Sequence, residues 1–109
     1  MKIRFDPNFI DTLKKVNVRT RKSFKQRIII FSKNPYEFQL NNHPLRAEWQ
    51  GFRSIDVTND YRAIYTEKEE GGVIIAYFVA LGTHKELYSN KLVPKVSCST
   101  LWYVQINLM

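Results

Sequence analysis

The chain is short of residues that several classes of protein need. It has a single cysteine, Cys98, so no disulfide can form within the chain, which is typical of a protein from a reducing compartment. Its cysteine, histidines and acidic residues show no zinc-finger spacing. The four glycines do not have the spacing of a P-loop or of a dinucleotide-binding fingerprint. The sequence therefore gives no sign of a disulfide scaffold, a zinc module or a nucleotide-binding loop.

Long hydrophobic runs are also missing. The longest apolar runs, at residues 28–31 and 73–81, are far shorter than the roughly 20 residues that cross a bilayer. The first residues, KIRFD, are charged and lack the apolar segment of a signal peptide. With 109 residues, 44% apolar and 25% charged, the chain has the composition of one globular domain. We therefore predict a cytoplasmic protein that does not enter a membrane.

Acidic residues are scarce in the first third of the chain. Residues 1–35 contain ten Lys and Arg but two Asp, whereas residues 36–109 contain seven Lys and Arg and eight Asp and Glu. The net charge of +7 therefore arises in the first third. A concentrated positive surface favours a nucleic acid, an anionic membrane or an acidic protein as partner. The alternative is a solvated helix face that is basic without a partner.

The first third predicts one strand and two helices. Residues 2–6 alternate apolar and charged side chains, as in a half-buried strand. An Asp-Pro pair then starts a helix, which apolar residues at helical spacing predict over residues 7–17. Thr20 can cap a second helix over residues 21–33, which an Asn-Pro pair ends. The short connection predicts an antiparallel helical hairpin.

The rest of the chain changes to a period of two. A loop rich in proline and asparagine is expected at 34–45, and Asn59-Asp60 is a candidate two-residue turn. Three strands are predicted in a meander, over residues 52–58, 61–67 and 73–81. The last is apolar enough to be buried on both faces, and one or two helical turns follow it. The predicted fold class is α+β, with a mostly antiparallel sheet and helices on one face.

His84 and Asp60 are the first candidates for chemistry. His84 directly follows the third strand of the meander, and Asp60 lies in the turn between the first two. If the strand lengths match, both fall at the same edge of the sheet and face each other. A histidine and a carboxylate can move protons near neutral pH. The alternative is that both are structural. His43 is equally ambiguous: it is either a loop residue or a third candidate for proton transfer.

Two arginines and two aromatic residues complete the candidate set. Arg53 and Arg62 lie on neighbouring strands, where they either pair with acidic neighbours or hold a phosphate with the planar guanidinium group. Trp49 and Tyr88 either stack on RNA bases or pack against the sheet.

Residues 44–88 resemble a known family. They contain GFRSIDVTNDYRAIY, then a charged turn, then a strand that ends in GTHKELY. This pattern resembles the C-terminal half of the RelE/ParE superfamily of toxins from toxin–antitoxin pairs. The resemblance implies a RelE-like microbial RNase fold, with an N-terminal strand, a two-helix hairpin, a three-strand meander and a short C-terminal helix. It implies one domain over residues 1–91 and leaves 92–109 as an apolar extension of unknown role.

The histidine-bearing ending is most similar to the YafQ-like branch, whose members cleave mRNA on the ribosome. The resemblance implies three catalytic residues: His84, Asp60 and His43. It implies a set of substrate-binding residues, Arg62, Arg53, Tyr88 and Trp49. Two positions depart from the branch: Asp56 stands where it has another active-site histidine, and Ala80 where it has a phosphate-contacting arginine. Loss of that arginine should weaken stabilisation of the transition state.

The implied reaction needs no metal and no cofactor. A base removes the proton of a ribose 2′-OH, which attacks the adjacent phosphate, and an acid protonates the leaving 5′-oxygen. We expect His84 to be the acid, Asp60 or His43 the base, and Arg62 to lie at the phosphate. The implied partners are a cognate antitoxin, in a toxin–antitoxin hetero-oligomer, and the ribosome with its mRNA. The alternatives are a ParE-like inhibitor of DNA gyrase and a catalytically weakened homologue that acts only by binding.

Overall fold

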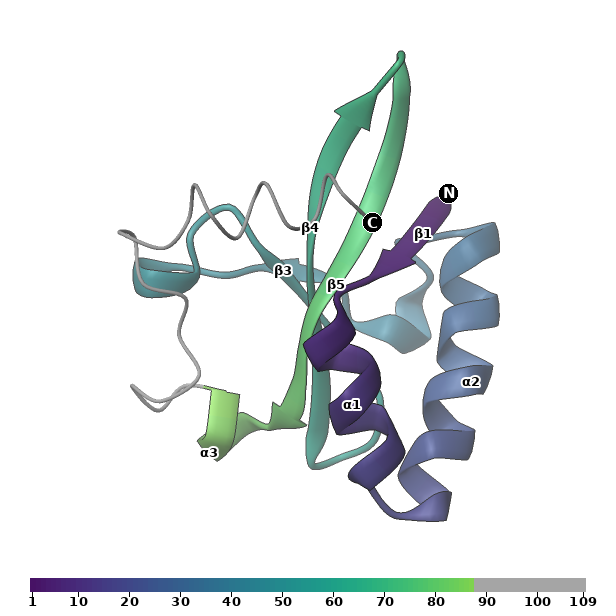
Figure 1. Cartoon of the computed structure of the whole chain (residues 1–109), viewed down its shortest axis with the longest axis vertical. Helices are drawn as coiled ribbons and strands as arrows, with labels where there is room; N and C mark the ends of the chain where they lie inside the picture. The colour runs from purple at the N-terminus through teal and green to yellow at the C-terminus, as the bar shows by residue number, and fades with distance from the viewer. Residues whose placement is uncertain (88–109) are drawn as a thin grey trace.

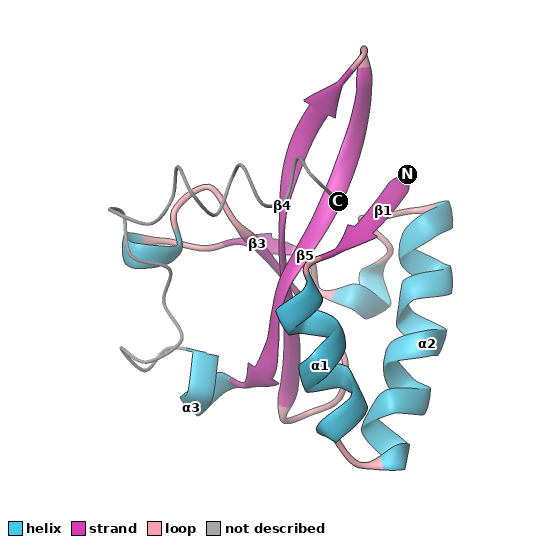
Figure 2. Cartoon of the chain, viewed as in Figure 1, coloured by secondary structure: helices cyan, strands magenta, loops and turns pink. Residues whose placement is uncertain are grey.

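The structure, a computed structural model that describes residues 1–87, is built on a five-stranded sheet with strand order β1-β5-β4-β3-β2 (Figures 1 and 2). Strand β1 is parallel to β5, and the other neighbours are antiparallel. The elements in chain order are β1 (Lys2–Phe5), α1 (Pro7–Lys15), α2 (Val18–Lys33), the 3-10 turn η1 (Phe38–Leu40), β2 (His43–Pro44), the 3-10 turn η2 (Ala47–Trp49), β3 (Arg53–Asp56), β4 (Tyr61–Glu70), β5 (Val73–Thr83) and α3 (His84–Leu87). The predicted α+β fold is confirmed.

Helices α1 and α2 form the predicted antiparallel hairpin against one face of the sheet (Figure 1). Asp6 caps α1, because its Oδ1 accepts a hydrogen bond of 2.8 Å from Asn8 N. Asn17 caps α2 in the same way, with 2.8 Å between its Oδ1 and Thr20 N. The second helix therefore begins three residues earlier than predicted. Thr20 is not its cap but a buried residue of its first turn, since Asn17 already supplies a strong capping side chain.

Aromatic rings fill the space between the helical hairpin and the sheet. Phe78, on the interior strand β5, is completely buried. The centroid of its ring lies 5.1–6.2 Å from the centroids of five others, those of Phe5, Phe9, Phe24, Phe31 and Tyr65. These rings come from β1, α1, α2 and β4, so a single side chain joins four elements to β5.

A β-bulge at Val79 decides which side chains of β5 reach which face. The register runs from Ile64 opposite Ala80 to Tyr65 opposite Phe78, so Val79 has no partner on β4. One extra residue shifts the alternation of the strand by one position. Both Val79 and Ala80 therefore pack with Ile64 on the face opposite the helices.

The sheet extends further than the sequence predicted. The segment expected to be a loop, residues 34–45, contains η1 and the edge strand β2, which is too short to show a period. The predicted two-residue turn is wider: residues 57–60 lie between β3 and β4, and the amides of Val57 and Thr58 both donate to the carbonyl of Tyr61. The predicted extension over 92–109 lies outside the described residues.

No helix among residues 1–87 is long and apolar enough to cross a membrane.

Candidate active site

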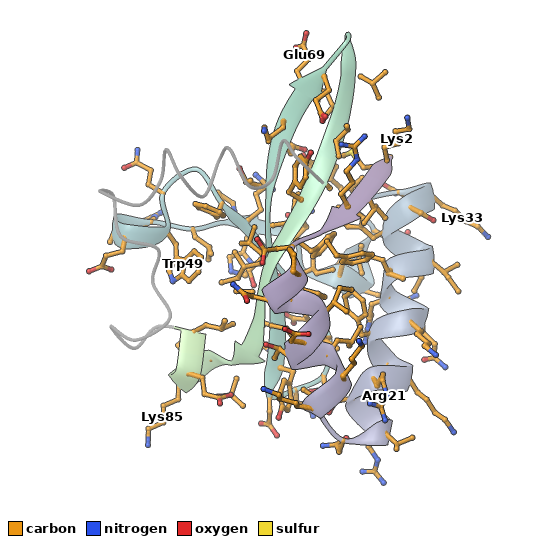
Figure 3. The ribbon with its side chains drawn as sticks, viewed as in Figure 1. Lys2, Arg21, Lys33, Trp49, Glu69 and Lys85 are labelled. Atoms are coloured by element: carbon orange, nitrogen blue, oxygen red, sulfur yellow. The ribbon has the colours of Figure 1, made fainter. Side chains whose placement is uncertain are left out.

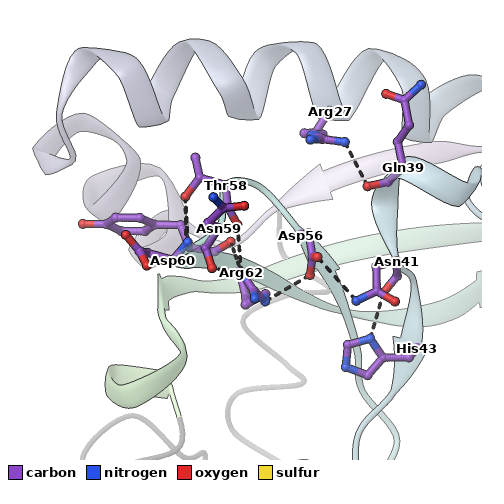
Figure 4. Close-up of polar contacts among 10 residues, drawn as sticks. Arg27, Gln39, Asn41, His43, Asp56, Thr58, Asn59, Asp60 and Arg62 are labelled. Carbon is purple, nitrogen blue, oxygen red and sulfur yellow. Dashed lines mark hydrogen bonds and ion pairs between the residues drawn. The ribbon is translucent and has the colours of Figure 1, made fainter.

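A line of polar side chains crosses the sheet face that lies opposite α1 and α2 (Figure 4). At its centre Asp56 on β3 is paired in register with Arg62 on β4, and Arg62 Nε lies 3.0 Å from Asp56 Oδ1. Their neighbours Ile55 and Ala63 belong to the core under the helices. Because successive side chains of a strand alternate, Asp56 and Arg62 point to the other face.

Arg62 also holds the turn between its strand and β3. Its Nη1 lies 2.8 Å from the carbonyl oxygen of Thr58, 3.1 Å from that of Asn59 and 3.0 Å from that of Tyr61. Its Nη2 makes no hydrogen bond to any residue from 1 to 87, and the side chain is 21% exposed. Nη2 can therefore donate to an incoming phosphate oxygen while the rest of the guanidinium group stays fixed.

Asp60 and His84 are adjacent, as predicted from the strand lengths. The backbone amide of His84 donates to the carbonyl of Asp60 across 3.3 Å. The turn itself is closed by Thr58, whose Oγ1 accepts from the amides of Asp60 at 3.2 Å and Tyr61 at 3.0 Å. Both the carboxylate of Asp60 and the imidazole of His84 are exposed to solvent. The backbones of Asp60 and His84 thus meet where β5 ends beside the start of β4, and both side chains are open to solvent.

The position of His84 depends on a capping box that the sequence reasoning missed. Thr83 Oγ1 accepts from the amide of Glu86 at 3.2 Å, and Glu86 Oε1 accepts from the amide of Thr83 at 2.9 Å. The hydrogen bond from the Thr83 amide, with a second from its hydroxyl, lowers the pKa of Glu86 below its usual value. The signal was available as Thr-x-x-Glu in residues 83–86.

His43 lies on the far side of the Asp56–Arg62 pair from Asp60 (Figure 4). In register it stands beside Ser54, and the row continues through Ile64 to Ala80 on β5. Three strand spacings separate β2 from β5, about 14 Å between the backbones. The predicted catalytic residues therefore flank the arginine instead of forming one cluster.

The ring of His43 has a defined orientation. Its Nδ1 lies 2.8 Å from the carbonyl oxygen of Asn41. A carbonyl can only accept, so Nδ1 carries the proton, and in the neutral ring Nε2 keeps its lone pair. Nε2 makes no hydrogen bond with the described residues. Asn41 has a left-handed backbone, with φ of 49°, and its Nδ2 lies 3.4 Å from Asp56 Oδ2. Sequence reasoning did not single out Asn41.

The structure does not bring Arg53 into this line. Arg53 precedes Ser54 by one residue, so it points to the helix side of the sheet. Its Nε donates to Asn42 Oδ1 at 2.7 Å, and its guanidinium carbon lies 5.3 Å from the ring centroid of Tyr36. Arg53 therefore stands behind the sheet face that carries Arg62.

Trp49 is buried, which corrects its predicted role as a stacking surface. Its side chain is 2% exposed and packs with Ile64 and Leu87 on the sheet face away from the helices (Figure 3). Its Nε1 donates to the carbonyl of Leu87 at 3.0 Å, so it anchors α3 to the sheet. The ring has no free face for a base. Ala80 packs at the edge of the same cluster, and Tyr88 lies outside the described residues.

The arrangement supplies proton transfer and one fixed positive charge. Within residues 1–87, no three His, Cys, Asp or Glu side chains are grouped so that they could hold a metal ion. Two imidazoles and a carboxylate lie on either side of a guanidinium group whose Nη2 can donate. Such a set suits displacement at a phosphate, which needs a base, an acid and a donor for the charged oxygens.

Comparisons with known proteins agree on one fold. Among solved structures, YafQ from Escherichia coli BL21(DE3) superposes with a TM-score of 0.66 at 23% identity, over 81% of this chain and 98% of that chain. A YoeB/ParE toxin from Agrobacterium tumefaciens gives 0.63 at 17% identity, over 77% and 99%. The E. coli DinJ–YafQ complex gives 0.54 at 22% identity, over 81% and 98%. These identities are low enough that they establish the fold alone.

A search among curated proteins finds no match. The model of one protein family, described as the bacterial toxin YafQ of type II toxin–antitoxin systems, matches residues 1–89. That span covers every element of the described structure, including the strand ends that carry Asp60 and His84. The chain therefore belongs to the YafQ family of bacterial toxins of type II toxin–antitoxin systems.

Proposed function

We propose that this toxin is an endoribonuclease that cleaves mRNA on the ribosome, by attack of a ribose 2′-OH on the adjacent phosphate. The observation that carries the proposal is the position of Arg62 between His43 and the Asp60–His84 pair. In such a displacement the entering and leaving oxygens lie on opposite sides of the phosphorus. A phosphate at Arg62 Nη2 would have one proton-transfer group on each side.

The roles follow from the surroundings of each group. His43 donates from Nδ1 to Asn41, so its Nε2 can take the proton of the 2′-OH. His84, at the other end of the line, then protonates the leaving 5′-oxygen. Asp60 is the second candidate for the base, because its carboxylate is exposed beside His84. Each proton-transfer group is worth about 10²–10⁴ in rate.

The test compares single variants in a translation extract with mRNA. His84→Ala should lower the cleavage rate by about 100-fold or more, while Lys85→Ala, the exposed neighbour on the same helix, should stay within about twofold. Circular dichroism checks that each variant is folded. A His84→Ala variant that cleaves mRNA and arrests growth as strongly as the parent would refute the assignment.

The identity of the base is read from the pH profile of the same reaction. If His43 is the base, His43→Ala removes the rise in rate with pH that loss of a proton from the base produces, and Asp60→Asn keeps that rise. The reverse result assigns the base to Asp60. If both variants keep the rise in rate with pH, both assignments are contradicted.

The partners of the toxin follow from its family and its charge. A type II toxin has a cognate antitoxin, and we propose that the two form a hetero-oligomer. The hairpin exposes a set of basic side chains, Lys14, Lys15, Arg19, Lys22, Lys25 and Lys33, and Figure 3 shows Lys33 pointing outward from α2. This surface suits both an acidic antitoxin segment and ribosomal RNA phosphate. Mutual exclusion of the two partners would explain inhibition by the antitoxin.

A binding-only function is the second candidate, and Ala80 favours it. Ala80 lies on the same face as the Arg62 side chain but packs in an apolar cluster and supplies no charge. If no cleavage product forms while translation still stops, the protein acts by binding alone and the nuclease proposal is wrong. The gyrase alternative is less consistent with the acid–base line of the site and with the YafQ family match. A supercoiling assay with purified gyrase tests it directly.

A further inference from the structure

Two exposed aromatic rings stand beside the site without a role in the chemistry above. Phe38 is 93% exposed and Tyr36 is 58% exposed, which makes them the two most exposed apolar side chains in the described part of the chain. Both line a cavity of about 470 Å³ together with a polar set, Glu37, Gln39, Asn41, Asn42 and Asp56. Singly exposed apolar residues are ordinary, but a pair at the edge of a cavity marks a binding surface.

The segment that carries these rings is held in place. Leu40, the last residue of η1, is completely buried in the core. Arg27 on α2 donates to the carbonyl of Gln39 at 2.9 Å, which fastens η1 to the helix (Figure 4). Asn34 Oδ1 accepts from the amide of Tyr36 at 3.1 Å. The rings are thus exposed on an anchored backbone, so little ordering is needed when a ligand binds.

The cavity is continuous with the proposed active site. Asp56 lines it and is the ion-pair partner of Arg62. Asn41 lines it too, and the carbonyl of Asn41 orients His43. A nucleic-acid strand with a phosphate at Arg62 therefore passes the mouth of the cavity.

The lining favours a nucleobase over an aliphatic side chain. Five of the seven lining residues are polar or charged, so an aliphatic group would strip water from them without compensation. The side chains of Glu37 and Gln39 make no hydrogen bond with other described residues and can meet the polar edge of a base. The guanidinium carbon of Arg53 lies 5.3 Å from the ring centroid of Tyr36, and this cation–π contact helps to hold that ring in place at the edge of the cavity.

We propose that this cavity is a base-binding subsite for single-stranded RNA, in which one base stacks on Phe38 while the adjoining phosphate lies at Arg62. The proposal rests on the proposed function for its substrate class. It adds to the nuclease a surface that grips the strand by a base as well as by its phosphates.

The test distinguishes binding to the bases of the RNA from binding to its phosphates. A fluorescein-labelled 2′-O-methyl RNA hexamer, which has no free 2′-OH and is not cleaved, is titrated with the full chain, and so is an abasic strand with the same number of phosphates. The parent protein should prefer the strand that carries bases. Phe38→Ala should weaken that strand's binding by on the order of tenfold and leave the abasic strand unchanged, since stacking on one ring is worth that much. Phe38→Trp should retain the preference.

Ile29→Ala is the matched control, because Ile29 is an exposed apolar residue on α2 outside the cavity. It should bind both strands as the parent does. The proposal is overturned if the parent shows no preference, if Phe38→Ala binds as the parent does, or if it loses affinity for both strands equally. It is also overturned if Phe38→Ala weakens only the antitoxin complex.

A separate cleavage assay on translated mRNA distinguishes the two proposals. Preference for bases without cleavage supports the subsite and refutes the nuclease. Cleavage without a preference for the strand that carries bases refutes the subsite and remains consistent with the nuclease.

Discussion

Arg62 joins local structure to chemistry. Its Nε and Nη1 are used by Asp56 and by the carbonyls of the turn before it, and this leaves Nη2 without a hydrogen bond among residues 1–87. A planar group with five donors can do both at once, because one edge is fixed while another remains open. The same contacts set the path of the turn that carries Asp60. A change at Arg62 should therefore affect stability and activity together.

Arg62→Lys tests this dependence. An ammonium group keeps the charge but cannot reach Asp56 and three carbonyls together, so we expect the free energy of unfolding to fall by about 1–2 kcal/mol. Cleavage should fall by about tenfold or more. Urea denaturation and the mRNA assay measure the two effects. Arg46→Lys, at an exposed arginine before η2, is the control and should change neither. If Arg62→Lys is as stable as the parent protein, Arg62 does not hold the turn between β3 and β4.

At the scale of the element, α3 is a single helical turn that depends on its ends. Thr83 and Glu86 close its start by their reciprocal hydrogen bonds, and Trp49 binds the carbonyl of Leu87 at its finish. A helix this short has no stability of its own. The place of His84 is therefore set by side chains that do no chemistry.

The capping box predicts a pH effect. Because Thr83 lowers the pKa of Glu86 in the folded protein, the carboxylate stabilises the fold above its unfolded pKa near 4.5. That contribution is lost as pH falls through the lower folded value. Glu86→Ala should cost about 0.5–1 kcal/mol at pH 7, at the lower end because Glu86 is exposed, and less at pH 3.

Hydrogen exchange of the Thr83 amide measures this locally, and thermal unfolding measures it globally. Glu86→Gln keeps an acceptor for the amide of Thr83 and should show no pH dependence in the acid range. An equal loss in Glu86→Ala at pH 7 and pH 3 would disprove the role of the carboxylate.

At the scale of the whole molecule, Phe78 connects the helical hairpin to the sheet. Its ring contacts aromatic rings from β1, α1, α2 and β4, so the packing of one strand determines how the hairpin sits. The site lies on the other face of the same strands. Loss of this core should loosen the sheet that holds Arg62 and Asp56 in register.

Phe78→Ala should lower the free energy of unfolding by about 3–5 kcal/mol, and Phe78→Leu by about 1–2 kcal/mol, because alanine leaves a larger cavity. Val73→Ala, at the exposed start of the same strand, is the control and should stay within about 0.5 kcal/mol. Urea denaturation compares the three. A similar loss in Phe78→Ala and Val73→Ala would mean that the aromatic cluster does not stabilise the fold.

The site was predictable where the polar residues sit at strand ends. The adjacency of His84 and Asp60 followed from strand lengths, because the turn and the end of the third strand share an edge. The separation of Arg53 from Arg62 did not, since it needs the pairing of β3 with β4 as well as alternation. The sequence also left open whether Trp49 stacks on RNA or packs against the sheet. Its burial depends on α3 folding back onto the sheet, a contact between residues 38 positions apart.

The sequence by itself determined the α+β fold, the helical hairpin, the basic first third and the residues that can transfer protons, because period, caps and charge are local properties. The tertiary structure alone decided which residues share a face. The bulge at Val79, the edge strand that carries His43 and the anchored η1 that presents Phe38 arise from pairing and packing between distant segments. No local pattern encodes those contacts, and they place Arg62 between the two histidines.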